Sequence, residues 1–303
     1  MQAGSRAGEK ELDMAKIGII GGSGVYKIEG IKNLKEAKVK TPFGEPSDVY
    51  RIGELNGVSV VFLPRHGSKH TKCPSEINYR ANIFGMKKLG VERLISVSAC
   101  GSLKEELKPM DFVLPDQFVD RTNSARDMTF FKGGIVAHVG MADPVCSELV
   151  RSIYDTARGL NLSIHLGGAY LNMEGPAFST RAESNLYRSW GASIIGMTNM
   201  AEARLAREAE MCFATIAAVT DYDCWHESHE AVTVEMILGN LAKNADNAKL
   251  LLRECVAKIS EKKTCSCSES LKYAIVTRKA DISAKLKRGL APLIGKYVGE
   301  YGI

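Results

Sequence analysis

Short apolar runs that end in glycine or a small hydroxyl residue alternate along this chain with longer stretches of helical spacing. The first run, 16–21, reads Lys-Ile-Gly-Ile-Ile-Gly and leads into a glycine-rich segment, which is typical of a buried strand that ends in a tight turn. Strand-like runs also occupy 93–98, 193–197 and 211–220, and helical patterns occupy 75–89, 143–159, 200–210 and 232–259. The alternation predicts an α/β fold, with a mostly parallel central β-sheet flanked by helices in a single domain.

The predicted sheet is mixed, because one connection is too short to join parallel strands. Two apolar runs, 48–55 and 58–63, flank Asn56-Gly57, a dipeptide suited to a type I′ hairpin turn. A two-residue connection of this kind joins antiparallel strands. We therefore expect this pair to be antiparallel within the otherwise mostly parallel sheet.

The composition fits one globular domain with an extension at each end. The 303 residues are 45% hydrophobic, which is enough for a substantial core. Residues 1–15 form a polar leader, and no run reaches the about 18 apolar residues of a membrane span, so we expect a cytoplasmic protein without a membrane partner.

A polar, turn-rich segment after Ser260 sets the domain at 16–260 and leaves 261–303 as a basic C-terminal extension of unknown role, either a docking helix or a mobile tail. The net charge of +5 is mild and shows no basic cluster before the extension, so nucleic acid is not an expected partner.

Eight cysteines are spread along the chain, and only Cys265 and Cys267 are closely spaced. Free thiols are the simplest expectation for a long chain in a reducing compartment. A structural or redox-sensitive disulfide is the first alternative. A metal site is the least favoured, because no second Cys or His pair stands at zinc-finger spacing, and the sequence assigns no metal ligand.

Four strand ends carry groups suited to binding an oxyanion. Ser23 lies in the glycine-rich turn, Arg65 and His66 follow the apolar run 58–63, and Ser98 and Thr198 stand at two further strand ends. Backbone amides of a glycine turn, a guanidinium fork and hydroxyls are all donors to phosphate. Each strand end is equally an ordinary turn when taken alone, but together they indicate one shared anion site.

A pair of carboxylates, Asp221 and Asp223, follows the apolar strand 211–220. Residues two apart in an extended chain share one face. Partial burial raises the pKa of a carboxyl group and allows it to donate a proton near neutrality, although aspartates at a strand exit are also common turn residues. Farther upstream, Asn199 and Glu202 have the spacing of a capping box at the start of the 200–210 helix, which favours a structural role for Glu202.

Nine motifs, taken in order, resemble the trimeric purine nucleoside phosphorylase family. They are Gly21-Gly-Ser-Gly24, Thr41-Pro-Phe-Gly44, Arg65-His-Gly67, Ala99-Cys-Gly-Ser102, Asp116-Gln-Phe-Val-Asp-Arg121, Met173-Glu-Gly-Pro-Ala-Phe-Ser179, Arg181-Ala-Glu-Ser184, Gly196-Met-Thr198 and Thr220-Asp-Tyr-Asp-Cys-Trp225. The resemblance covers about 16–260 and leaves the C-terminal extension without a clear counterpart.

The resemblance implies a nucleoside phosphorylase fold and the phosphate-dependent cleavage of 5′-methylthioadenosine to adenine and 5-methylthioribose 1-phosphate, a step of purine and methionine salvage. It implies no metal or organic cofactor. Inorganic phosphate takes part as a co-substrate. The phosphate ligands that it implies are Ser23, Arg65, His66, Ser98, Ala99 and Thr198. Met197 is implied at the sugar and base.

The family's base site falls on Asp221 and Asp223, with Ser179 beside them. Adenine presents an acceptor at N7 next to a donor at N6, and a protonated carboxyl group matches both. The 6-oxopurine branch carries Asn at the Asp221 position and Glu at the Ser179 position, so both residues here favour a 6-aminopurine. Asp221 is therefore the expected general acid, with Asp223 sharing the catalytic site.

The methylthio group is expected against Val234, with His138 reaching the site from a neighbouring subunit of a homotrimer or a dimer of trimers. Val234 could equally be the start of an amphipathic helix. One alternative is a phosphorylase of the same family that prefers 6-oxopurine nucleosides or methylthioinosine. The alternative from another class is a noncatalytic protein that binds adenine nucleosides.

Overall fold

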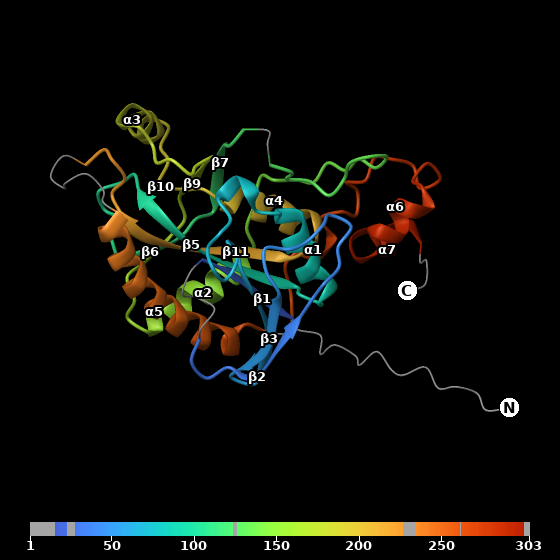
Figure 1. The fold of residues 1–303 in the computed structure, drawn as a ribbon, viewed down its shortest axis with the longest axis horizontal. Helices are drawn as coiled ribbons and strands as arrows, with labels where there is room; N and C mark the ends of the chain where they lie inside the picture. The colour runs from blue at the N-terminus through green and yellow to red at the C-terminus, as the bar shows by residue number, and fades with distance from the viewer. Residues whose placement is uncertain (1–15, 23–27, 124–125, 227–233, 261, 300–303) are drawn as a thin grey trace.

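The computed structural model describes residues 1–303 apart from 1–15, 23–27, 124–125, 227–233, 261 and 300–303. Its described strands form one eleven-stranded sheet at the centre of the molecule (Figure 1). They are β1 (Ile17–Gly21), β2 (Lys32–Ala37), β3 (Tyr50–Leu55), β4 (Val58–Pro64), β5 (Arg93–Ser102), β6 (Phe112–Leu114), β7 (Gln117–Arg121), β8 (Ile164–Leu166), β9 (Ala169–Met173), β10 (Ile194–Gly196) and β11 (Cys212–Asp221).

The sheet is mixed and mostly parallel, which confirms the predicted fold class. Strands β4, β1, β5 and β11 lie side by side and parallel. Strands β3 and β4 are antiparallel around Asn56-Gly57, as the hairpin turn predicts. Strand β10 runs antiparallel to the end of β5, with Ile195 opposite Gly101, so β10 begins beside the carboxyl end of β5 and its chain then runs back along that strand.

Helices cover both faces of the sheet. They are α1 (Tyr79–Lys88), α2 (Ser147–Gly159), α3 (Arg181–Ser189), α4 (Asn199–Glu208), α5 (Val234–Lys258), α6 (Ala284–Gly289) and α7 (Ala291–Val298), with short 3₁₀ turns η1 (Pro74–Glu76) and η2 (Cys267–Glu269). The side chains of β4 show how the two faces are filled. Val61 and Leu63 join one core with α1, α4 and α7, whereas Val60 and Phe62 join a second core with α2 and α5. Apolar side chains at consecutive positions are expected in a strand that is covered on both faces.

The long elements match the sequence patterns within a few residues, and the short ones do not. The predicted helix 75–89 is divided into η1 and α1, because the Asn78 side chain accepts a hydrogen bond from the Ala81 N–H and starts the helix there. Strands β2 and β6–β9 and helix α3 were not predicted. Several of these are only three to six residues long, which is too short to establish a period.

The capping box expected at the start of α4 is wrong. Thr198 is the N-cap residue, and Asn199 is already the first helical residue. The Glu202 carboxylate instead binds the Arg65 guanidinium, with Nε 2.5 Å from Oε1. A charge-assisted contact with a buried guanidinium outcompetes a local cap, because leaving either charge unpaired in the interior costs more.

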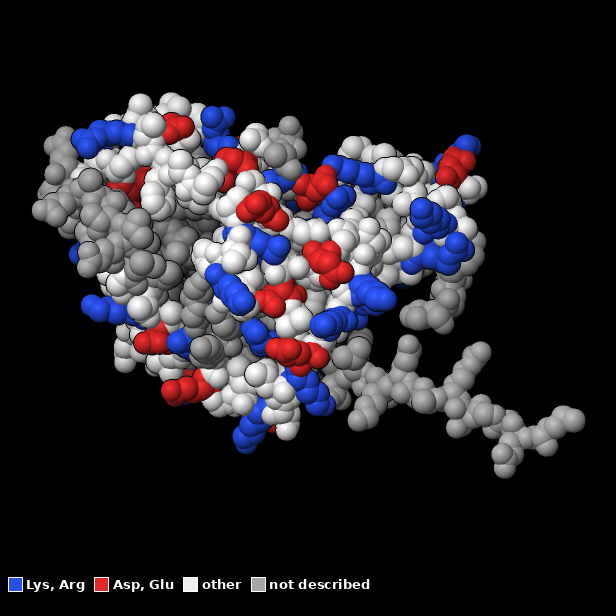
Figure 2. All heavy atoms as spheres, viewed as in Figure 1, with Lys and Arg blue, Asp and Glu red and all other residues white. Residues whose placement is uncertain are grey.

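The described part of the C-terminal extension packs on the domain. Leu271, Leu293 and Ile294 are buried in the same core as α1 and α4. Basic side chains gather over the region of α6, whose sequence is Ala-Lys-Leu-Lys-Arg-Gly (Figure 2). None of the helices in the described part of the chain combines the length and hydrophobicity needed to cross a bilayer.

Candidate active site

A cavity of about 590 Å³ lies where the carboxyl ends of β1, β4, β5 and β11 meet the returning end of β10. This volume is in the range of sites that hold a small organic ligand. Its lining includes eight residues that the sequence singled out: Arg65, His66, Ser98, Ala99, Met197, Thr198, Asp221 and Asp223. The structure thus brings residues from four separate strand ends to one space.

Four other predicted residues are placed differently. Ser23 and the side chain of Val234 lie outside the described residues. Ser179 is buried and lies behind the cavity wall, where its hydroxyl faces the Asp223 carboxyl. His138 is exposed and is not among the lining residues, and its backbone N–H donates to the Ala274 carbonyl at 2.8 Å. Its role at a neighbouring subunit's site stays a prediction.

Arg65 is a buried cation at the cavity wall, with 2% of its surface exposed. Its Nε and Nη2 atoms donate to the two Glu202 oxygens at 2.5 and 3.0 Å. The fork that the sequence analysis assigned to an oxyanion is therefore engaged by a carboxylate. Nη1 carries two N–H groups, and the Val97 carbonyl accepts one of them at 3.0 Å, which leaves Nη1 as the end that can reach an anion.

His66 enters the site as a neutral side chain. Burial and the neighbouring Arg65 charge lower its pKa to about 4. Its Nδ1 lies 2.8 Å from the Lys72 carbonyl, which can only accept a hydrogen bond, so the proton of the neutral ring belongs on Nδ1. Nε2 must gain a proton before His66 can donate to a fully ionised phosphate.

Two hydroxyls and a helix end complete the polar half of the cavity. Thr198 is the N-cap of α4, and its side chain makes no capping bond, so the hydroxyl can face a ligand. The α4 amides at this end carry partial positive charge. Ser98 Oγ lies 3.3 Å from the Tyr170 hydroxyl oxygen, and this contact holds the Ser98 side chain within the second half of β5.

Asp221 ends β11 as a buried carboxyl group that can hold a proton. Burial raises the pKa of this carboxyl group. Hydrogen bonds from the Thr220 hydroxyl and the Asp223 amide lower it, but by less. Thr220 Oγ1 lies 2.6 Å from Asp221 Oδ2 and 3.2 Å from the Cys100 carbonyl. Because a hydroxyl has one proton, a Thr220 that donates to Cys100 can accept one from a protonated Asp221.

Asp223 faces the same cavity with an unsatisfied oxygen. Its Oδ2 is buried and makes no hydrogen bond with another described residue. Burial raises its pKa, the nearby Ser184 hydroxyl opposes this, and the Asp221 charge adds to the increase. Its backbone is left-handed, with φ of 53°, and its N–H donates to Asp221 Oδ1 at 2.8 Å. This Asx turn directs both carboxyl groups toward one end of the cavity.

Gly101 makes room for the acid pair. A Cβ atom at this position would lie 3.0 Å from Asp221 Oδ1 and 3.1 Å from Ile195 Cγ2. Neither neighbour can give way freely, because Asp221 is held by the Asx turn and Ile195 is buried in β10. A glycine at the end of β5 is thus required by the close approach of the β11 carboxyl group.

The sequence analysis did not single out several residues that line the cavity. Phe178, although part of a quoted motif, stands at the cavity with 58% of its surface exposed, well placed to stack on a planar base. Asn244 and Ala248 come from α5. A signal for Phe178 was present, since it is an aromatic residue that closely follows the turn residues Gly175 and Pro176. Nothing local distinguishes the α5 residues from the rest of an amphipathic helix.

The chain matches the model of the phosphorylase superfamily over residues 16–257. It is 55% identical over 282 residues to an S-methyl-5′-thioadenosine phosphorylase of Geobacter sulfurreducens, which covers 93% of this chain and 99% of the relative. A protein with the same name from Koribacter versatilis is 56% identical over 94% of this chain and 98% of its own. These spans are longer than 16–260, so the likeness extends into the C-terminal extension, for which the sequence analysis found no counterpart.

Solved structures that resemble this chain carry the same kind of name as these relatives. A methylthioadenosine phosphorylase from an antarctic soil metagenomic library superposes with a TM-score of 0.88 at 49% identity, covering 92% of this chain and 98% of the other. A methylthioadenosine phosphorylase from Schistosoma mansoni in complex with adenine has a TM-score of 0.77 at 37% identity, covering 85% of this chain and 96% of the other.

Proposed function

Because the chain belongs to the phosphorylase superfamily, we propose that it cleaves 5′-methylthioadenosine with inorganic phosphate, giving adenine and 5-methylthioribose 1-phosphate. The observation that carries this proposal is the division of one cavity between a cationic, hydroxyl-bearing half and a pair of buried carboxyl groups with raised pKa values. The first half suits an oxyanion and the second suits a departing base.

Phosphate is held by Arg65 Nη1, by His66 and by the hydroxyls of Ser98 and Thr198, with Ser23 as a further ligand. One phosphate oxygen attacks the anomeric carbon of the ribose as the bond from that carbon to N9 of the base breaks. The electron pair of the broken bond moves into the purine. Binding phosphate and nucleoside in one cavity removes the entropic cost of bringing them together.

Asp221 donates its proton to N7 of the purine, so that neutral adenine departs. The carboxyl group then accepts a hydrogen bond from the 6-amino group through its other oxygen. Asp223 offers its unpartnered Oδ2 to the same base. A positioned acid of this kind contributes about 10²–10⁴-fold to the rate.

We also propose the compartment in which the enzyme works, its cofactor requirement and its subunit assembly. The enzyme works in the cytoplasm in purine and methionine salvage, without a metal or organic cofactor in the reaction. It is a homotrimer or a dimer of trimers, in which His138 of one subunit completes the site of the next. His138 is exposed and is not among the residues that line the chain's own cavity, which supports this arrangement.

The test is adenine release from 5′-methylthioadenosine with and without phosphate. Release that depends on phosphate, with an equal yield of 5-methylthioribose 1-phosphate, is expected. Faster cleavage of inosine or methylthioinosine would move the activity to the 6-oxopurine branch. Tight binding of the nucleoside without any adenine release would make the chain a noncatalytic binding protein.

A further inference from the structure

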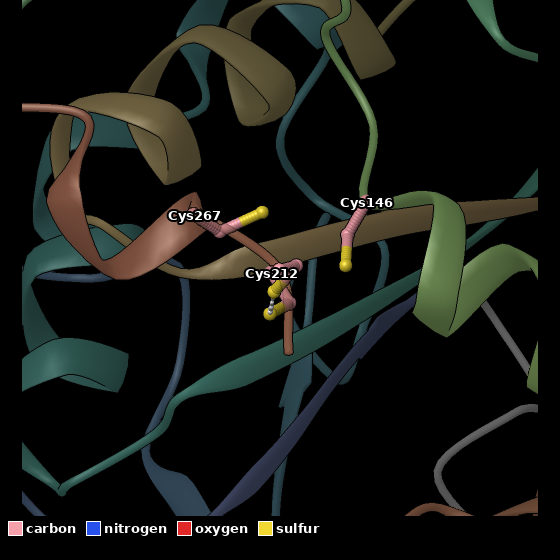
Figure 3. A group of neighbouring side chains, drawn as sticks. Cys146, Cys212 and Cys267 are labelled. Carbon is pink, nitrogen blue, oxygen red and sulfur yellow. Dashed lines mark hydrogen bonds between the residues drawn. The ribbon is translucent and has the colours of Figure 1, made fainter. Parts of the chain in front are cut away.

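Four cysteines from three separate segments converge at the edge of the sheet opposite the cavity. The Sγ atoms of Cys146, Cys212, Cys265 and Cys267 all lie within 4.8 Å of one another, and three of these residues are buried. Figure 3 shows Cys146, Cys212 and Cys267 gathered around one space, with a dashed line that marks the contact of the Cys212 sulfur with the Cys265 sulfur. All eight cysteines lie in the described part of the chain, and no disulfide joins any two of them there.

We propose that these four cysteines bind one Zn²⁺ ion as a structural site. Zinc bound by four thiolates is tetrahedral with bonds of about 2.3 Å, which places the sulfur atoms about 3.8 Å apart. The Cys212 and Cys265 sulfurs are 3.4 Å apart, and the farthest pair needs to close by about 1 Å to reach this geometry. Binding displaces the thiol protons to solvent, and no electron is transferred.

The mutual closeness of all four sulfurs favours a metal over disulfides. A disulfide needs one pair at about 2.05 Å and places no demand on a third or fourth sulfur. Here each sulfur has the other three within one coordination sphere, which is the arrangement that a tetrahedral ion requires. Thiolate ligands select soft or borderline ions and do not suit Mg²⁺ or Ca²⁺.

Hydrogen bonds within the protein hold the three segments in this arrangement. The Cys146 N–H, just before α2, donates to the Phe213 carbonyl at 2.8 Å and so fixes Cys146 beside the start of β11. The Thr264 N–H donates to Glu148 Oε1 at 2.9 Å, and this bond places the segment with Cys265 against α2. The ligands are therefore largely pre-positioned, which lowers the entropic cost of binding.

The site is structural rather than catalytic, because of its place in the fold. Cys212 begins β11 and Asp221 ends it, so the two sites are roughly 30 Å apart along a ten-residue strand. Four protein ligands leave no open position for a substrate. Cys267 packs with the core on the α2 and α5 face, whereas Leu271 packs with the core on the α1 and α4 face. The ion would thus fix the point where the C-terminal extension crosses from one face of the sheet to the other.

The first experiment measures metal in the unmodified full-length protein. The protein is purified under reducing conditions with a histidine-free tag and without chelators, and its metals are determined by mass spectrometry. We expect about one zinc per chain. A zinc content near zero overturns the proposal. Alkylation followed by peptide mass measurement then shows whether the thiols are free or disulfide-bonded, and the proposal is overturned in either case. Iron in place of zinc also overturns it.

The second experiment assigns the ligands with matched variants. Cys267→Ser and Cys146→Ser are expected to lose at least about tenfold in zinc affinity. Cys255→Ser is the control, because Cys255 is equally buried in the same core but lies outside the group of four. Equal zinc content in Cys267→Ser and Cys255→Ser contradicts the site.

A third measurement reports coordination directly and does not depend on the variants folding. Co²⁺ exchanged into the unmodified protein is expected to give the visible bands of a tetrahedral site and thiolate-to-metal charge transfer. Chelator should lower the Tm of the unmodified protein and of Cys255→Ser by several degrees and leave that of Cys267→Ser unchanged. An octahedral cobalt spectrum, or a Tm that chelator does not change, counts against the proposal.

Discussion

The two ends of β11 carry two different kinds of site. At its carboxyl end, Asp221 faces an open cavity beside Asp223, which has a buried oxygen that lacks a hydrogen-bond partner in the described part of the chain. At its amino end, Cys212 packs in a closed group of four thiols. The difference teaches that one strand can present an unpartnered carboxyl oxygen to a ligand at one end and hold four thiols against one another in a closed group at the other.

The largest expected effect is on chemistry at the carboxyl end. Asp221→Asn removes the proton donor and should lower kcat/KM for 5′-methylthioadenosine by about 10²–10⁴-fold, because an amide cannot protonate N7. Relative activity on 6-oxopurine nucleosides should rise, since Asn can donate to their O6. Steady-state assays on both substrates measure this. The metal content should not change, and if it fell with the activity, the two ends of β11 would not be independent.

A smaller loss is expected when the acid is displaced rather than removed. Gly101→Ala places a Cβ 3.0 Å from Asp221 Oδ1, so the carboxyl group must shift by a few tenths of an ångström. We expect kcat/KM to fall by about tenfold, less than the about 10²-fold that a misplacement of 1 Å costs. Gly159→Ala is the control, because a Cβ there meets no atom within 4 Å. Equal rates for the two variants would show that the close approach at Gly101 does not position the acid.

The pH dependence tests whether Asp221 works in its protonated form. Burial raises its pKa, so the acid form persists to higher pH than in a free aspartate, and its fraction falls as pH rises through the shifted pKa. Above that pKa, kcat/KM should fall about tenfold per pH unit, and Asp221→Asn should lack this limb of the profile. Parallel profiles for the unmodified protein and the variant would assign the limb to another group, such as phosphate itself.

The smallest expected effect is a proton taken up with phosphate. His66 has a pKa of about 4 in the free protein and is neutral at pH 7, and an adjacent phosphate raises that pKa. Binding should therefore take up a fraction of a proton near pH 6–7, a change that His66→Asn abolishes. Titration calorimetry in two buffers of different ionisation enthalpy measures the uptake. The control is His165→Asn, since His165 lies on β8, 2.8 Å from Asp111 and away from the cavity, and the same uptake in both variants would contradict the assignment.

The sequence by itself determined the fold class and most of the cavity lining. The runs 16–21, 93–98 and 211–220 became β1, β5 and β11, because buried strands carry an apolar signal within a few consecutive residues. The residues that follow those strands form the cavity, since the carboxyl ends of parallel strands meet at one edge of a sheet.

The tertiary structure alone decided which distant residues meet. Glu202 was expected to cap its own helix and instead binds Arg65, 137 positions away. Cys265 and Cys267 had no partner pair at a recognisable spacing, yet folding brings Cys146 and Cys212 to them. Local patterns depend on neighbouring side chains, whereas these contacts depend on how the layers pack against one another, which no short stretch of sequence contains.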